Sequence, residues 1–228
     1  MKVILFGATG MVGQAVLGAC LRDPGVEAVL AIGRTPTGRS HPKLRELIRP
    51  DPFDTSVPEA ELQGYDACFF CLGVSSAGMN EAEYTRLTYD LTLAWARVLA
   101  RVNPETAFLY VSGAGTGGKS MWAQVKGRTE AALRGLFPAA YMVRLAMLRP
   151  THGEVSKTRW TRLTYTALGP IAPLIERLAP SLVISTEDLG RAMIRAARER
   201  PPTHVLEMRD LKALAGGRSR TVDHGANR

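Results

Sequence analysis

Three glycines near the start of the chain constrain its fold more than any other feature. Gly7, Gly10 and Gly13 follow the apolar run Lys2–Phe6 and lead into apolar residues at helical spacing. Small residues permit a tight turn and a close backbone approach to a ligand, and a helix start offers unpaired N–H groups to a pyrophosphate. The pattern predicts a dinucleotide-binding strand–loop–helix unit. The residues expected to contact the dinucleotide there are Gly7, Thr9, Gly10, Met11, Val12 and Gly13.

Arg34 indicates which dinucleotide to expect, because it follows Glu27–Ile32, the predicted second strand. At this place a carboxylate accepts hydrogen bonds from a ribose 2′-OH, whereas an arginine accommodates a 2′-phosphate. No carboxylate lies between Glu27 and Glu46. We therefore expect NADP(H) in preference to NAD(H), and the alternative is a solvated basic loop. The basic residues of this window are Arg34, Arg39, Lys43 and Arg45.

The rest of the chain alternates between patterns typical of strands and of helices. Further strands are predicted at 66–72, 106–112 and 141–145, and a helix is predicted near Leu44–Ile48. Longer helices are expected to begin after Asn80, which with Glu83 has the form of a capping box, and after Ser120 and Ser185. This alternation predicts an α/β, doubly wound parallel sheet, the Rossmann fold.

The length of 228 residues fits one core. We expect a single NAD(P)-binding domain over residues 1–215. Its substrate-side elements should lie mainly in 150–215, as a small helical portion with Pro-broken amphipathic segments at 158–180. Residues 216–228 have the composition of a flexible tail.

The net charge of +8 indicates an anionic partner, and its distribution narrows the choice. Residues 119–162 hold nine of the 29 basic residues but only two of the 21 acidic ones. This concentration favours a phosphorylated cofactor and an anionic small-molecule substrate over nucleic acid, and it leaves a homo-oligomer open. Three cysteines, scattered histidines and interrupted apolar runs predict a cytoplasmic chain without disulfides, a metal site or a transmembrane segment. Cys68 and Cys71 are expected in the core.

A second glycine loop, Gly113–Ser120, also follows a predicted strand and matches the phosphate-loop pattern GxxxxGK[ST]. In a nucleotide hydrolase, Lys119 would contact the terminal phosphates and Ser120 would bind magnesium. Such enzymes also need an Asp at the end of an apolar strand. Asp66 begins its strand instead, and the Asp residues after the loop lie in a helix cap, before a short helix and in the tail. A phosphate-loop hydrolase is therefore the third hypothesis.

Taken in order, these motifs resemble the short-chain dehydrogenase/reductase superfamily, most closely its atypical branch of NAD(P)-binding proteins that includes the Tat-interacting-protein type. The resemblance covers roughly residues 1–214. It implies further cofactor contacts after the fourth and fifth strands and at a later Arg-Pro turn. The motif residues that carry it, besides the first glycine loop and Arg34, are Cys71, Leu72, Gly73, Val111, Ser112, Lys126, Arg149 and Pro150.

The resemblance also implies a catalytic trio of Ser, Tyr and Lys. The Tyr passes a proton, the Lys lowers the Tyr pKa and holds the nicotinamide ribose, and the Ser orients the carbonyl. Ser112 and Lys126 match, but Trp122 stands where the Tyr is expected, four residues before Lys126. An indole N–H donates a hydrogen bond but cannot ionise. Either Tyr84, Tyr89, water or a substrate group supplies the proton, or the chain binds NADP(H) without turnover.

The sequence thus favours an NADP(H)-binding oxidoreductase that transfers hydride to or from a small carbonyl or alcohol. The alternative is a non-catalytic NADP(H)-binding protein that regulates a partner, a hypothesis that Trp122 motivates.

Overall fold

The computed structural model describes residues 1–151 and 182–217. Within them, seven parallel strands form one sheet in the order β3-β2-β1-β4-β5-β6-β9, and β7 and β8 pair as a separate two-stranded sheet. The expected Rossmann-type α/β fold is confirmed. The strands are β1 (Lys2–Phe6), β2 (Ala28–Gly33), β3 (Leu44–Ile48), β4 (Ala67–Phe70), β5 (Ala107–Gly113), β6 (Ala140–Leu145), β7 (Met147–Arg149), β8 (Val183–Ser185) and β9 (Val205–Leu206).

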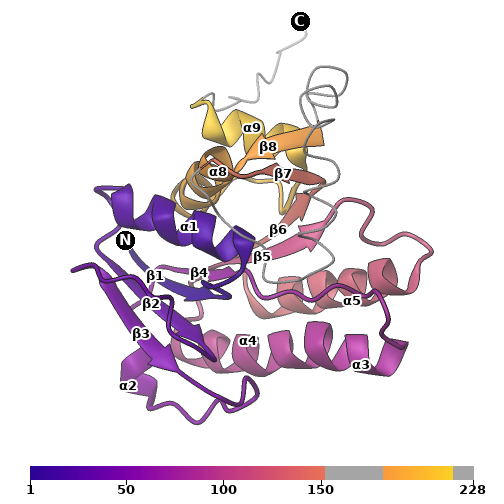
Figure 1. Cartoon of the computed structure of the whole chain (residues 1–228), viewed down its shortest axis with the longest axis horizontal. Helices are drawn as coiled ribbons and strands as arrows, with labels where there is room; N and C mark the ends of the chain where they lie inside the picture. The colour runs from indigo at the N-terminus through magenta and orange to yellow at the C-terminus, as the bar shows by residue number, and fades with distance from the viewer. Residues whose placement is uncertain (152–181, 218–228) are drawn as a thin grey trace, which may run out of the picture.

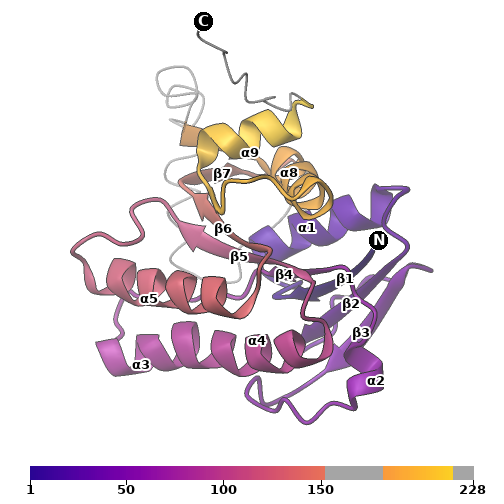
Figure 2. The same cartoon turned by 180° about the vertical axis from the view of Figure 1, so that it is seen from behind.

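Helices cover both faces of the large sheet (Figures 1 and 2). One face carries α1 (Met11–Arg22), α8 (Thr186–Glu199) and α9 (Met208–Ala215). The other carries α5 (Met121–Leu136) and one continuous helix in which α3 (Glu81–Thr85) and α4 (Leu91–Val102) flank the π-helical turn η1 (Arg86–Asp90). A short helix, α2 (Glu59–Leu62), precedes β4.

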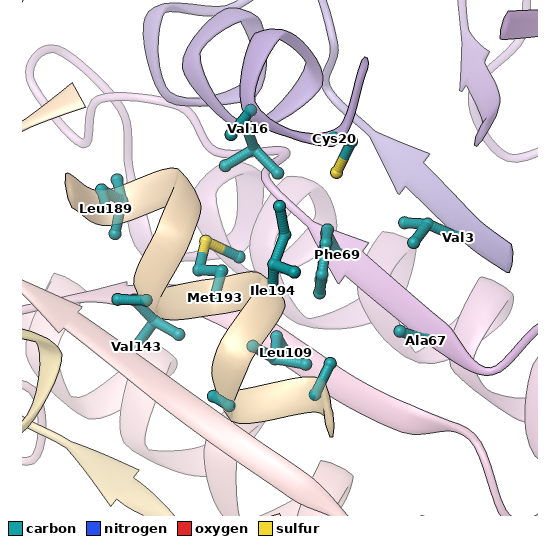
Figure 3. Packing of buried hydrophobic residues seen from close by; sticks show 14 of the residues in the cluster. Val3, Val16, Cys20, Ala67, Phe69, Leu109, Val143, Leu189, Met193 and Ile194 are labelled. Carbon is teal, nitrogen blue, oxygen red and sulfur yellow. The ribbon is translucent and has the colours of Figure 1, made fainter. Parts of the chain in front are cut away.

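Strand side chains alternate between the two faces and so build two apolar layers. On the α1 side, Phe69 and Leu109 pack beneath Val16 of α1 and Met193 and Ile194 of α8 (Figure 3). Gly190 brings α8 very close to α1, because a Cβ there would lie 2.4 Å from the Cβ of Ala19. On the other side, an aromatic cluster of Phe6, Phe70, Trp95, Phe108, Tyr110 and Phe137 fills the layer.

Two predicted helix starts are confirmed. The Asn80 side chain accepts a hydrogen bond from the Glu83 N–H while the Glu83 carboxylate accepts one from the Asn80 N–H. Ser185 accepts from the Asp188 N–H at the start of α8. Ser120 begins α5 as expected, but its side chain does not cap the helix.

The predicted helix at Leu44–Ile48 is wrong, because these residues form β3. Leu44, Leu47 and Ile48 have helical spacing, but the segment pairs in parallel with β2 over its whole length, from Val29 beside Leu44 to Gly33 beside Ile48. The ladder of hydrogen bonds to a buried neighbour outweighs local periodicity. The segments predicted at 158–180 and most of the predicted tail lie outside the described residues.

Candidate functional site

The first glycine loop joins β1 to α1 through a very close backbone contact. Gly7 has a φ of +76°, and a Cβ there would lie 2.7 Å from the carbonyl carbon of Cys71. A Cβ on Gly13 would lie 2.0 Å from the Gly7 carbonyl oxygen. The Gly10 N–H donates to that same oxygen at 2.9 Å and closes the turn. Glycine is therefore required at positions 7 and 13 by space alone.

The start of α1 is open to an anion. Gly10 is the N-cap, α1 has no side-chain cap, and its first turn holds no acidic residue. The N–H groups of Met11, Val12 and Gly13 have no partner one turn earlier in the helix, and the helix dipole adds partial positive charge at this end. The loop thus fits a pyrophosphate group, and these residues would hold it through backbone N–H groups.

A cavity of about 310 Å³ lies beside this loop, at the carboxyl ends of β1, β2 and β3. Its volume is within the range of small-ligand sites, and its place next to the switch in strand order is where parallel sheets bind ligands. Four predicted contact residues line it: Gly7, Thr9, Arg34 and Leu72. The apolar part of its wall includes Phe6, Ile32, Ile48, Pro52, Leu72 and Trp95.

Trp95 holds the far wall of the cavity in place. Its ring is buried and lies 5.0 Å from the ring of Phe6, and its Nε1–H donates to the Pro52 carbonyl at 2.8 Å. This bond ties the loop after β3 to the helix below the sheet. The loop can then present a fixed apolar surface to a planar group.

Two charged residues of the cavity, Glu46 and Arg49, were missed by the sequence interpretation. One Glu46 carboxylate oxygen accepts the Thr37 N–H at 2.7 Å. The Arg49 guanidinium donates to the Ser56 carbonyl at 3.1 Å and lies 3.6 Å from Asp54. Had residues 44–48 been predicted as a strand, its alternation would have indicated that Glu46 shares a face with Ile48.

Ser112 is buried near the end of β5, and its side chain lies on the same face of the sheet as that of Tyr110. Its hydroxyl lies 2.8 Å from the Thr116 hydroxyl, which also donates to the Gly113 carbonyl at 2.7 Å. Thr116 was not predicted as a site residue. Because the Thr116 hydroxyl donates to the Gly113 carbonyl, the Ser112 hydroxyl donates to Thr116, and it would have to turn to donate to a substrate oxygen.

Trp122 lies half-buried in the first turn of α5, against the turn that follows β5. A Cβ at Gly113 would lie 3.5 Å from its ring, and one at Gly115 would lie 3.7 Å away. The indole thus covers the backbone beside Ser112. It stands at the position where the resemblance predicts a tyrosine, and its N–H can donate a hydrogen bond but cannot ionise.

Lys126 lies one turn further along α5, beside the same strand end. Its Nζ donates to the Val111 carbonyl at 3.4 Å and lies 5.4 Å from the centre of the Tyr110 ring. Burial lowers the pKa of Lys126 to about 8, and the negative charge of Glu130 opposes this effect. Glu130 is itself buried and pairs with Arg144 of β6 at 2.6 Å.

The second glycine loop is built differently from a phosphate cradle. Its backbone N–H groups are used internally: Ala114 donates to Leu145, Thr116 to Gly113, Gly117 to Ala123 and Gly118 to Gly115. These N–H groups cannot cradle a phosphate in this conformation. Asp66 precedes β4 and accepts the Lys2 N–H at the amino ends of the strands, whereas the loop lies at their carboxyl ends. The geometry does not support the hydrolase hypothesis.

The other predicted site residues are divided between two places. Cys71, Leu72 and Gly73 follow β4, beside the first glycine loop. Arg149 and Pro150 instead belong to the β7–β8 layer, where Arg149 pairs with Ser185. Tyr84 is buried in α3, and burial raises its pKa, so it is a poorer acid than an ordinary tyrosine.

The three cysteines and the possible metal ligands can be placed in the described part of the chain. All three thiols are free, and burial raises the pKa of Cys20 to about 12. Residues 1–151 and 182–217 contain no cluster of side chains able to hold a metal ion. Over the same residues, every helix is too short or too polar to span a membrane.

No protein-family model matches this sequence. A curated fungal protein, "Leucinostatins biosynthesis cluster protein T" of Purpureocillium lilacinum, is 30% identical over 115 residues, which cover 49% of this chain and 42% of that protein. The chain therefore matches less than half the length of this relative.

Solved structures resemble the whole fold. UDP-glucose 4-epimerase from Bifidobacterium longum, in complex with NAD⁺ and UDP, has a TM-score of 0.66 at 18% identity, covering 90% of this chain and 76% of that one. A short-chain dehydrogenase/reductase superfamily protein from Agrobacterium tumefaciens with bound NAD has a TM-score of 0.61 at 16% identity, covering 86% and 73%. The chain has their fold.

Proposed function

We propose that this chain is an oxidoreductase that binds NADP(H) and interconverts a small carbonyl compound and its alcohol. The observation that carries the proposal is the glycine cradle, in which Gly7 and Gly13 leave no room for a Cβ beside an uncapped helix start. Similar structures bound to NAD support a dinucleotide at this place.

Within this proposal each part of the site has one task. The N–H groups at the start of α1 bind the pyrophosphate, and the cavity lined by Ile32, Leu72 and Trp95 receives the adenosine. The nicotinamide, when bound, would donate or accept the hydride. Ser112, on turning its hydroxyl from Thr116 to the substrate, would orient the carbonyl oxygen, and the indole of Trp122 would exclude water from that side.

Arg34 is the residue proposed to select NADP(H). We expect Arg34→Ala to weaken NADPH binding about 10-fold or more while NADH binding changes little, because only the 2′-phosphate loses a charge-assisted hydrogen bond. Titrations with NADPH, NADH and ATP–magnesium, followed by fluorescence or calorimetry, measure this. Glu46→Gln is the matched variant: removal of this carboxylate from the same cavity should favour NADPH. A wild-type preference for NADH would overturn the assignment.

The second candidate function is a non-catalytic NADP(H)-binding protein whose cofactor occupancy regulates a partner. The absence of an ionisable group at position 122 favours it, as does the short hydrogen bond that engages Ser112 with Thr116.

Trp122→Tyr separates the two candidates. The new phenol would lie one turn before Lys126, and we expect turnover of a simple carbonyl such as 4-nitrobenzaldehyde to rise about 100-fold, the usual contribution of a positioned acid. NADPH oxidation at 340 nm measures the rate, and Trp122→Phe is the control that removes the indole without adding an acid. No gain from tyrosine, with NADPH still bound, would favour either the regulatory protein or a different proton donor in an active enzyme.

A further inference from the structure

Within residues 1–151 and 182–217, Lys126 is the one basic side chain whose pKa burial lowers strongly, and it forms no ion pair with a carboxylate there. Among the described residues, none of the carboxylate oxygens lies within 4.0 Å of its Nζ. The nearest candidate by sequence, Glu130, spends both of its oxygens on Arg144, at 3.1 and 2.6 Å. Burying an amine without a carboxylate partner costs stability, and lysines with lowered pKa values are typical of functional sites.

The surroundings of Lys126 are known on each side. The ring of Tyr110 on β5 lies beneath the Nζ, and the Val111 carbonyl accepts a hydrogen bond from it. Glu130 is on the same helix, and Arg144 of β6 holds it. Burial raises the pKa of Tyr110, so this ring stays neutral near pH 8 and adds no charge beside the lysine.

Lys126 is also placed where its amine could reach a substrate oxygen beside Ser112. The Val111 carbonyl, which accepts a hydrogen bond from Lys126, belongs to the residue immediately before Ser112. One turn before Lys126 lies Trp122, whose indole cannot ionise. Four methylenes between the backbone and Nζ allow the amine to leave the Val111 carbonyl for a substrate oxygen. Parallel sheets bind their ligands at the carboxyl ends of their strands, where Val111 and Ser112 lie.

We infer that Lys126 itself is the proton donor and acceptor of the proposed oxidoreductase, in the role that a tyrosine would otherwise have. In reduction, Lys126 Nζ gives a proton to the carbonyl oxygen as the carbonyl carbon accepts a hydride from the reduced nicotinamide. The C=O bond becomes CH–OH, the nicotinamide is oxidised, and the neutral amine takes a proton back from water. This inference rests on the proposed function. A pKa near 8 lets the amine exist in both forms near neutral pH.

Lys126→Arg tests the inference, because arginine keeps the positive charge but does not lose its proton. We expect kcat for NADPH-dependent reduction of 4-nitrobenzaldehyde to fall about 100-fold or more, while the Kd of NADPH changes less than about threefold. Lys212→Met on α9, remote from this edge, is the control variant. If Lys126→Arg keeps kcat within about threefold, the lysine only binds and the inference fails.

A measurement without turnover completes the test. Competitive labelling of the cofactor-free protein with acetic anhydride, read by peptide mass spectrometry, follows the reactivity of Lys126 against pH. Titration near pH 8 is expected, and titration at or above pH 10 would overturn the inference. Absence of NADP(H) binding by the wild-type chain would instead overturn the proposed function, so the two failures are distinguishable.

Discussion

Gly13→Ala should both destabilise the fold and abolish dinucleotide binding. The added Cβ would lie 2.0 Å from the Gly7 carbonyl oxygen and 2.6 Å from its carbonyl carbon. Both are backbone atoms, so α1 has to move away from β1, and the turn that forms the anion site opens. Overpacking of this kind costs about 3 kcal/mol or more. Urea unfolding measures the loss of stability, and titration with NADPH measures the loss of binding.

Gly18→Ala in the same helix is the matched control for this prediction. Its added Cβ would meet only the ends of the Arg22 and Arg39 side chains, at 3.2 and 3.4 Å, and these can move. Because alanine favours a helix over glycine by about 0.5–1 kcal/mol, this variant should be neutral or more stable. Equal destabilisation by the two variants would show that α1 tolerates no added methyl and that the Gly7 contact is not special.

Arg144→Leu is expected to lower the free energy of unfolding by about 3–5 kcal/mol, the cost of leaving a buried charge without its partner. Glu130 is only 5% exposed, and its carboxylate receives two hydrogen bonds from the Arg144 guanidinium. The variant leaves this carboxylate facing leucine. Denaturant unfolding near neutral pH gives the value.

Glu207→Gln is the control, because Arg144 also pairs with Glu207, at 3.3 Å, but that side chain is 43% exposed. Glutamine keeps the acceptor that caps α9, and partly exposed pairs contribute about 1 kcal/mol or less. If Arg144→Leu costs no more than Glu207→Gln, the buried pair does not stabilise the sheet edge as the geometry indicates.

The parts of the fold that local chemistry controls were predictable from the sequence. The Gly7–Gly13 turn, the Asn80–Glu83 capping box and the Ser185 cap lie where their residues indicate, since the contacts that close them join residues at most six positions apart. The helix predicted at Leu44–Ile48 was wrong, because these residues form a strand once β2 provides the hydrogen bonds.

The candidate site was predictable only in part, for the same reason. Arg34 and Gly7, both predicted cofactor contacts, line the cavity, but Glu46 enters it only because Leu44–Ile48 is a strand. Glu130 of α5 and Arg144 of β6 are 14 positions apart, and neither the helix pattern nor the strand pattern indicates that they pair. Without that contact, the unneutralised state of Lys126 is invisible in the sequence.

The contact between Gly190 and Ala19 sets the order in which the chain can complete its fold. The helix that follows the glycine loop packs against α8, which is translated more than 160 residues later. At about 5–20 residues per second, roughly 10–35 s pass before the nascent helix meets this partner. Until then the side of α1 that contacts α8 lacks this partner. A ribosome-bound chain stalled before α8 should therefore be a target for chaperones that recognise apolar helices.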